Sequence, residues 1–252
     1  MNVLVVDIGG KGSRNGQTEA WKFLSGPTMA PGDMVDGVNK FTRDWKYHVI
    51  SIGYPGPALH NRPIAEPPNL APGWVGFRFE HVFGRTLKLI NDAAMQALGS
   101  YEGRKMLFLG LGTGLGSAMV IDWVVEPMEL GHLPYRKGTY ENCVGLRVLE
   151  KFGKKKWQRH VADVVPHLTA ALLPDDVVPG GGKVKKLTVL SQGCRAGDNA
   201  NAFRGGFRSW EQMGEYKLPQ NPPMTTDSPR TQARDEQKVR GTSRTRIGRV
   251  AA

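Results

Sequence analysis

The stretch that decides the fold reads Leu107-Phe108-Leu109-Gly110-Leu111-Gly112-Thr113-Gly114-Leu115-Gly116-Ser117. Every second residue from Gly110 to Gly116 is a glycine. These glycines separate the apolar run that starts at Leu107 from a second run, 117–122, which again has the composition of a strand. A dinucleotide-binding glycine motif must open a helix, and a P-loop needs a following Gly-Lys-Ser/Thr, so neither site is indicated. Glycines let backbone N–H groups approach a ligand closely, and a row of such groups can hold an anion. The stretch therefore predicts a β-hairpin whose turn either binds phosphate or is an ordinary glycine-rich hairpin.

Apolar runs and helical patterns alternate on both sides of this hairpin, up to about residue 210. Most of the apolar runs are unbroken Val, Ile and Leu, which is typical of a sheet covered on both faces. The expected strands are Asn2–Val6, Tyr47–Gly53, Thr86–Ile90, Lys105–Gly110, Ser117–Asp122 and Asp176–Val178, and the expected helices are Gly32–Asp44, Ala93–Ser100, Val144–Gly153 and Lys156–Leu172. Pro166 should kink or split the last of these helices. The mixture predicts an α/β fold.

An earlier stretch, Leu4-Val5-Val6-Asp7-Ile8-Gly9-Gly10, has the same strand-then-glycine form about one domain length before the hairpin. The spacing predicts a duplicated lobe, with an N-terminal lobe over residues 1–105 and a C-terminal lobe over 106–210. From residue 211 the chain is rich in Pro, Arg, Thr and Gln and poor in apolar residues. Such a composition cannot offset the entropy of ordering, so we expect residues 211–252 to form a disordered basic tail.

The composition excludes several classes of protein. A net charge of +11 favours anionic partners in general, but the sequence has no helix-turn-helix, zinc-finger or RNA-recognition signature. No apolar run reaches the roughly 20 residues of a membrane span, and the first residues read as a buried strand rather than a signal peptide, so we expect a cytoplasmic protein. Two widely spaced cysteines, Cys143 and Cys194, exclude a disulfide framework and a four-thiolate zinc site.

A carboxylate follows the strand that ends at Ile90. Asn91-Asp92 stands there between the strand and the helix that begins at Ala93. An Asp at such a turn is most often the N-cap of the helix. The alternative is a ligand-binding carboxylate at the carboxyl edge of the sheet, where it would accept a proton from a hydroxyl.

Glu129 and His132 follow the hairpin in Glu126-Pro127-Met128-Glu129-Leu130-Gly131-His132. Their spacing across a glycine can aim both side chains at one ligand. Polyols suit such a pair because each hydroxyl both donates and accepts a hydrogen bond. A surface hydrogen bond between the two side chains is the alternative.

Taken in order, these segments resemble the repressor–ORF–kinase (ROK) family of sugar kinases over residues 1 to about 210, and look closest to its polyphosphate- or ATP-dependent glucokinases. The matching strings are Val5-Val6-Asp7-Ile8-Gly9-Gly10, Gly53-Tyr54-Pro55-Gly56-Pro57, Asn69-Leu70 with Gly73-Trp74, Asn91-Asp92-Ala93, Gly110 to Gly116, Glu129-Leu130-Gly131-His132 and Gly180-Gly181-Gly182. The resemblance implies the two-lobed α/β superfold of actin, hexokinase and Hsp70, which is ribonuclease H-like. It also implies a homodimer and a cytoplasmic enzyme of carbohydrate phosphorylation in glycolysis.

The family also implies a role for each matching residue. Asp92 would be the catalytic base, and Asn69, Asn91, Glu129 and His132 would hold sugar hydroxyls. The phosphate- and nucleotide-binding residues would be Asp7, Gly9, Gly10, Gly112, Thr113, Gly114, Gly181 and Gly182. Mg²⁺ would be carried by the phosphates with Asp7 nearby, and either Glu141 or Glu150 would be a third sugar-binding carboxylate.

Two stretches depart from the family pattern. The family expects a Thr and a nearby Lys just after Gly10, but residues 11–17 read Lys-Gly-Ser-Arg-Asn-Gly-Gln. Many members also carry a zinc-binding cysteine cluster after the Glu-x-Gly-His string, which is missing here, so zinc is not implied. The resemblance thus predicts phosphoryl transfer from ATP or polyphosphate to the 6-hydroxyl of glucose or a related hexose. A non-catalytic sugar-binding relative is the alternative, and a basic nucleic-acid-binding protein, resting on charge alone, is a third hypothesis.

A basic run, Lys154-Lys155-Lys156-Trp157-Gln158-Arg159, lies on an expected helix. A solvated helix face is one interpretation. The other is a track for polyphosphate, whose linear charge would reward several Lys and Arg contacts.

Overall fold

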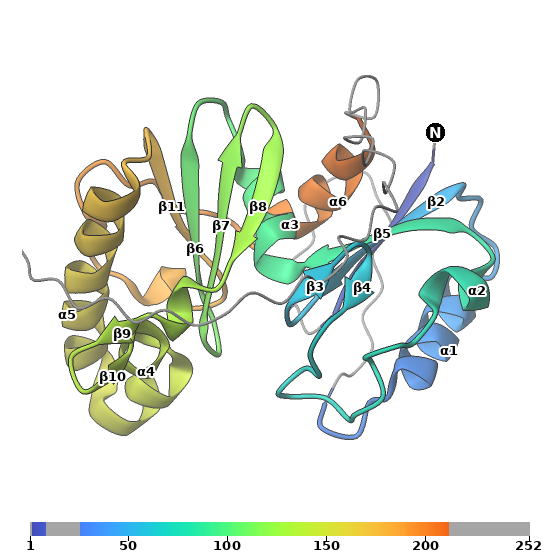
Figure 1. The fold of residues 1–252 in the computed structure, drawn as a ribbon, viewed down its shortest axis with the longest axis horizontal. Coiled ribbons are helices and arrows are strands. Elements are labelled where there is room, and N and C mark those ends of the chain that lie inside the picture. The colour runs from blue at the N-terminus through green and yellow to red at the C-terminus, as the bar shows by residue number, and fades with distance from the viewer. Residues whose placement is uncertain (1, 9–25, 212–252) are drawn as a thin grey trace, which may run out of the picture. The chain divides into compact units, whose positions relative to one another are not determined.

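The computed structural model describes residues 2–8 and 26–211, which contain two main β-sheets and the helices that cover them (Figure 1). The first sheet is parallel, in the order β1-β2-β5. Its strands are β1 (Val3–Asp7), β2 (Val49–Tyr54) and β5 (Thr86–Asn91), and the helices beside it are α1 (Pro31–Phe41), α2 (Phe79–Phe83) and α6 (Asn201–Glu211).

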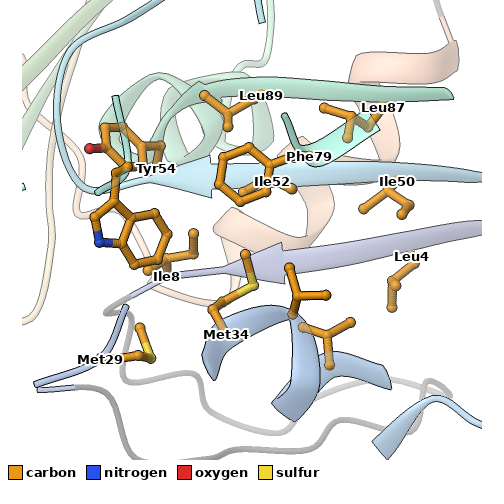
Figure 2. Close-up of a cluster of buried hydrophobic side chains, with 13 residues drawn as sticks. Leu4, Ile8, Met29, Met34, Ile50, Ile52, Tyr54, Phe79, Leu87 and Leu89 are labelled. Atoms are coloured by element: carbon orange, nitrogen blue, oxygen red, sulfur yellow. The ribbon is translucent and has the colours of Figure 1, made fainter. Parts of the chain in front are cut away.

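The first sheet is covered on both faces, which explains its unbroken apolar strands. On one face, Ile50 and Ile52 of β2 pack in a buried cluster with Met34 of α1 (Figure 2). On the other face, the hydroxyl of Ser51 donates a hydrogen bond of 2.6 Å to the carbonyl oxygen of Gly206 in α6.

The second sheet has the order β11-β6-β7-β8, with β11 parallel to β6 and the remaining pairs antiparallel. Its elements are α3 (Asp92–Ser100), β6 (Met106–Leu111), β7 (Leu115–Ile121), β8 (Val124–Met128), α5 (Leu146–Leu172) and β11 (Asp176–Gly180). Trp157 and Val161 of α5 pack on one face, and Ala94 and Ala97 of α3 pack on the other. Because α3 also contacts β2 and β5, this helix touches both sheets.

Short elements complete the described residues. They are β3 (Ala58–Leu59), β4 (Arg62–Pro63), the 3₁₀ helix η1 (Leu130–His132), β9 (Pro134–Tyr135), β10 (Gly138–Thr139), α4 (Tyr140–Val144) and the 3₁₀ helix η2 (Val184–Lys186). Both cysteines are free thiols, and among the described helices there is none long and apolar enough to cross a membrane.

All six predicted strands are present, with ends shifted by a few residues, and the glycine-rich stretch is a hairpin between β6 and β7 as predicted. Strand β8 was not predicted from the sequence because Pro127 interrupts its apolar run. It is the outer strand of the second sheet, and proline is tolerated there because one side of an edge strand has no ladder partner.

Helix α5 joins two predicted helices and breaks where they were expected to meet. Gly153 has a φ of 80° and a ψ of 169°, which are not helical angles. Pro166 was expected to kink or split the helix, and the split is wrong, because within α5 only Gly153 leaves the helical region. Pro166 is exposed on the helix surface, where its missing N–H weakens the helix without ending it.

Two substitutions in α5 are therefore expected to act in opposite directions. Gly153→Ala should lower the free energy of unfolding by about 1–3 kcal/mol, because a side chain is strained at this backbone conformation. Pro166→Ala should raise it by about 1–2 kcal/mol by restoring a helix hydrogen bond. Urea titrations of both variants measure these changes, and a destabilised Pro166→Ala protein would contradict the second expectation.

Helix α6 was not predicted, since two adjacent glycines, Gly205 and Gly206, lower its helix propensity. It ends at Glu211, which is the first residue of the predicted tail, and residues 212–252 lie outside the described part of the chain. Residues 2–8 and 26–211 belong to one compact unit, so the lobe boundaries at residues 105 and 210 stay predictions.

Candidate active site

Asp92 is the first residue of α3 and follows directly on β5. The sequence suggested it as the N-cap, but the cap is Asn91, whose Oδ1 accepts hydrogen bonds from the N–H groups of Ala93 (2.9 Å) and Ala94 (3.1 Å). The Asn91 amide nitrogen donates to the carbonyl of Gly56 at 3.1 Å. Asn91 thus holds the turn in place and leaves one amide hydrogen for a ligand. The Asp92 carboxylate is not needed as the cap, although its Oδ1 accepts from the N–H of Ala93 at 2.7 Å.

The environment of Asp92 favours its protonated form. Burial raises the pKa of its carboxyl group to about 7, and the neighbouring carboxylates of Asp7 and Glu129 add to this effect. A carboxyl group with a pKa close to neutral is suited to accept a proton from a hydroxyl and to release it afterwards.

Asp7 is the last residue of β1 and pairs with Gly53 of β2. A side chain at position 53 would come within 3.5 Å of the Asp7 Oδ1 and would overlap the Met95 side chain, so this glycine makes room for both. Burial raises the pKa of Asp7 to about 6, and its Oδ1 is buried without a hydrogen-bond partner among the described residues. An unpartnered buried carboxylate oxygen fits a cation or a cation-bound water, which agrees with Mg²⁺ near Asp7.

The hairpin turn and Asp92 are brought together by α3. A Cβ atom at Gly116 would lie 2.7 Å from the Cβ of Ala93, and one at Gly110 would lie 3.8 Å from it. The glycines therefore let the start of α3 rest directly on the β6–β7 hairpin. This places the residue next to Asp92 against the strands that hold the turn with Gly112, Thr113 and Gly114.

The second predicted phosphate segment lies beside the first, although it comes 70 residues later. Gly180 of β11 pairs with Gly110 of β6, and Gly181, with a φ of 81°, packs on Leu111. A Cβ at Gly181 would lie 2.7 Å from the Leu111 carbonyl oxygen, so only glycine fits. Gly182 continues this segment next to Asn199, whose Oδ1 is buried and unpartnered within the described residues. No sequence motif pointed to Asn199, because this residue stands in a loop outside every recognised motif.

The Glu129 and His132 side chains contact each other, with 3.4 Å between a carboxylate oxygen of Glu129 and the Nε2 of His132, which is the surface contact that the sequence left open as the alternative. Both side chains are more than half exposed, at 51% and 70% of their surface. Partial burial raises the pKa of Glu129, the neighbouring Glu141 also raises it, and His132 lowers it. The pair is thus a solvent-accessible donor and acceptor beside a third carboxylate.

That third carboxylate is Glu141 of α4. Its Oε2 lies 2.4 Å from the position of a Cβ at Gly114 and 3.4 Å from one at Gly131. It therefore fills the space between the hairpin turn and η1. Glu150 is exposed on α5 instead. The sequence left the choice between these two residues open. The position of Glu141 against the turn and its electrostatic effect on the pKa of Glu129 favour Glu141.

The contacts described above do not include the remaining predicted site residues. Asn69 is exposed in the loop before Trp74, a loop that Glu66 holds by accepting hydrogen bonds from three successive backbone N–H groups. Within residues 2–8 and 26–211, no hydrogen bond joins Asn69 to the other predicted sugar ligands. Gly9, Gly10 and the altered stretch 11–17 lie outside the described residues. Among the described ones, no group of three or more His, Cys, Asp and Glu could hold a metal ion.

No protein-family model matches the chain, but individual proteins of known sequence or structure are similar to it. In sequence, the chain is 24% identical over 206 residues to a polyphosphate glucokinase from Mycobacterium tuberculosis, which covers 72% of this chain and 77% of that protein. The solved structures that share its fold include the following two. One is an inorganic polyphosphate/ATP-glucomannokinase from Arthrobacter sp., with a TM-score of 0.60, 19% identity and coverage of 70% of this chain and 81% of that chain. The other is a ROK family glucokinase from Streptomyces griseus in complex with glucose and AMPPNP, with a TM-score of 0.58, 15% identity and coverage of 73% and 91%. The resemblance to the ROK sugar kinases is thereby confirmed: the chain is related in sequence to polyphosphate glucokinases and has the two-lobed α/β fold of the ROK family.

Proposed function

We propose that this chain is a sugar kinase that transfers a phosphoryl group from ATP or inorganic polyphosphate to the 6-hydroxyl of glucose or a closely related hexose. One observation carries the proposal. The Asp92 carboxyl group, with a pKa of about 7, begins a helix whose next residue, Ala93, packs on the glycine hairpin at Gly116. A proton acceptor and a turn suited to phosphate are thus held by one helix. The likeness to polyphosphate glucokinases supports the same reaction.

In the proposed reaction, the sugar oxygen forms a bond to the terminal phosphorus of the donor while the bridging P–O bond breaks. The hydroxyl proton passes to the Asp92 carboxylate, and the donor leaves as ADP or as a polyphosphate shorter by one unit. Glu129, His132 and Glu141 orient the hydroxyls, together with Asn69 and Asn91. The turn at residues 112–114 and the segment 181–182 hold the phosphates. Within the turn the Gly112 N–H already donates to the Gly114 carbonyl at 3.2 Å, so the N–H groups of the other residues are the donors to phosphate. Positioning and charge neutralisation supply most of the catalysis in phosphoryl transfer.

Asp7 is the residue that would lie beside Mg²⁺, since its Oδ1 is buried and unpartnered among the described residues. When bound to the donor phosphates, the ion would neutralise part of their charge. We expect no zinc, a homodimer and a cytoplasmic location from the resemblance, and these stay predictions.

A coupled assay of glucose 6-phosphate formation tests the proposal, with ATP and long-chain polyphosphate offered separately in the presence of Mg²⁺. Turnover with either donor is the expected result. The absence of turnover with both, from protein shown to be folded, would leave the non-catalytic sugar-binding alternative. That alternative rests on residues 11–17, and it predicts glucose binding in calorimetry without binding of either donor.

Glu141 offers a matched test of the sugar-binding residues. Glu141→Gln should raise KM for glucose about 10-fold or more, because the neutral amide forms a weaker hydrogen bond to a hydroxyl than the carboxylate does. The variant has nearly the same shape, so its packing against Gly114 should persist. Glu150→Gln, on the exposed surface of α5, should leave KM unchanged. Initial-rate kinetics of both variants decide the point, and a larger effect at Glu150 would reverse the assignment.

A further inference from the structure

A short β-hairpin separates two of the proposed sugar ligands. His132 is the last residue of η1 and Glu141 lies in α4, and strands β9 and β10 pair with each other between them (Figure 1). The N–H of Tyr140 donates to the carbonyl oxygen of Leu133 at 3.1 Å. These two residues are the direct chain neighbours of Glu141 and His132, so the hairpin sets the spacing between the two ligands. We call residues 133–140 the ligand hairpin.

One side chain of α5 holds the ligand hairpin. The hydroxyl of Tyr135 donates a hydrogen bond to the carboxylate of Asp163. The Nε of Arg136 donates to the same hydroxyl at 2.8 Å, and a second guanidinium nitrogen of Arg136 donates to the Oδ2 of Asp163 at 3.0 Å. The three side chains thus form a closed ring of hydrogen bonds, in which the tyrosine hydroxyl is both donor and acceptor. Hydrogen bonds to charged groups are stronger than those between neutral groups, so this ring is a firm anchor on α5.

The surroundings of Asp163 agree with an anchoring role. The hydrogen bonds from Tyr135 and Arg136 lower the pKa of its carboxyl group, which keeps the group ionised at neutral pH. Tyr135 is buried, and its ring stacks on that of Tyr140 with 5.0 Å between the centroids. Arg136 has a φ of 54°, in the left-handed region that a side chain disfavours. Such a backbone conformation persists only where the surrounding contacts hold it, and the contacts with Tyr135 and Asp163 do so here.

Helix α4, which carries Glu141, is held by contacts of its own. At its start, the Thr139 Oγ1 accepts from the N–H of Asn142 at 3.3 Å, and the Asn142 Oδ1 accepts from the N–H of Thr139 at 3.1 Å. At its end, the indole nitrogen of Trp157 donates to the carbonyl oxygen of Val144 at 2.6 Å. Release of the ligand hairpin from α5 should therefore displace the exposed His132 side chain more than that of Glu141.

From this arrangement we infer that Asp163 is a positioning residue of the sugar site: through Tyr135 and Arg136 it fixes the ligand hairpin and thereby the place of His132. The inference rests on the proposed function, because it takes His132 as a sugar ligand. Asp163 acts through the hairpin and not by contact with the sugar. Loss of the anchor should therefore weaken the binding of the hexose, while the transfer step, which depends on Asp92 and the glycine hairpin, should continue at nearly the same rate.

Tyr135→Phe tests the inference with little disturbance, because the ring keeps its packing and loses only the hydroxyl that joins Arg136 to Asp163. The variant should raise the dissociation constant and the KM for glucose about 5- to 10-fold, while kcat and the donor KM stay within about 2-fold. Asp163→Ala should do the same, and Asp163→Asn, which keeps an acceptor oxygen, should have a smaller effect. Calorimetry and initial-rate kinetics measure these changes, and circular dichroism melts check that each variant is folded at the assay temperature.

Glu102→Ala is the matched control. The Oε1 of Glu102 lies 3.3 Å from a guanidinium nitrogen of Arg195, in another partly exposed ion pair. Within residues 2–8 and 26–211, no hydrogen bond or ion pair joins Glu102 to the ligand hairpin. Its removal should leave the dissociation constant for glucose unchanged.

A double-mutant cycle separates positioning from general damage, because residues that act through one another have non-additive effects. In a protein that carries His132→Ala, Tyr135→Phe should weaken glucose binding by less than about 2-fold further, since the group that it positions is gone. In a protein that carries Glu141→Gln, Tyr135→Phe should keep most of its effect, because α4 is held separately.

Three results would overturn the inference. They are glucose binding by Tyr135→Phe as tight as that of the unmodified protein, a loss of kcat rather than of affinity, or an undiminished effect of Tyr135→Phe beside His132→Ala. An equal effect of Glu102→Ala would likewise contradict it. A failure of the proposed function is distinguishable, because the unmodified protein would then bind no hexose. If the unmodified protein binds glucose but turns over neither donor, the kinase proposal fails alone, and calorimetry still decides the role of Asp163.

Discussion

Replacing Asp92 with asparagine is expected to lower kcat for glucose phosphorylation by about 10²–10⁴-fold, the usual contribution of a positioned general base. Asparagine keeps the shape of the side chain but cannot accept the hydroxyl proton. The cap of α3 should persist because Asn91 supplies it. Sugar affinity in calorimetry should therefore change little. The control is Asp36→Asn on the exposed side of α1, which should keep full activity.

The pH dependence provides a second measurement of the same residue. The carboxylate of Asp92 must be ionised to accept a proton, and its pKa is raised to about 7. For the unmodified protein, kcat should therefore fall as the pH drops through about 7. Turnover by Asp92→Asn equal to that of the unmodified protein would remove Asp92 from the role of base.

The same variant should be more stable than the unmodified protein above neutral pH. The Asp92 pKa is raised from 3.8 to about 7 on folding, so the folded state keeps a proton that the unfolded chain releases between these values. Folding stability from this group is present at low pH and is lost as the pH rises through about 7. Asp92→Asn should therefore raise the thermal unfolding temperature at pH 8, and the difference should vanish near pH 4. A variant less stable than the unmodified protein at pH 8 would contradict this account of the burial of Asp92.

Replacing Gly205 with alanine is expected to disrupt the packing of α6 on α3. A Cβ atom at Gly205 would lie 1.7 Å from the backbone carbonyl oxygen of Met95, and one at Gly99 would lie 1.8 Å from that of Asn201. These contacts are to backbone, so the helices must move apart. The free energy of unfolding should fall by about 3 kcal/mol or more, which corresponds to a drop of roughly 6–12 °C in the unfolding temperature.

Activity should fall together with stability in the Gly205 variant. Helix α3 carries Asp92 at its start, and its C-terminal end is tied to α6 through Arg208. The guanidinium of Arg208 donates hydrogen bonds to the carbonyl oxygens of Leu98, Gly99 and Tyr101, at 2.9–3.1 Å. Moving α6 therefore moves the helix that positions the base.

Gly32→Ala is the matched control for this experiment. Gly32 lies within α1, and a Cβ atom there meets no other atom within 4 Å. Alanine should raise stability slightly, by up to about 1 kcal/mol, because it is the better helix former. Circular dichroism melts of both variants give the comparison. A Gly205→Ala protein that melts like the unmodified one would show that the two helices are not packed as closely as described.

The sequence by itself determined the strands, the glycine hairpin and the ordered motifs, because these depend on local patterns of apolar residues and glycine. It also led to the kinase family through Asp92 and Glu129. The helix break at Gly153 could also be predicted, because a glycine is a local signal. Strand β8 and helix α6 were not predicted, because Pro127 disfavours a strand and Gly205 disfavours a helix. Strand β8 is stabilised by pairing at the edge of a sheet, and α6 is stabilised by packing on α3. Local residue propensities contain neither interaction.

Only the tertiary structure decided which distant residues meet. It paired Gly180 with Gly110, placed Glu141 rather than Glu150 against the hairpin turn, and gave the cap of α3 to Asn91 so that Asp92 is available for chemistry. It also raised the pKa of Asp92 through burial and neighbouring carboxylates. The physical reason is the same throughout: contact, burial and charge coupling depend on distances in space, which the order of residues along the chain does not contain.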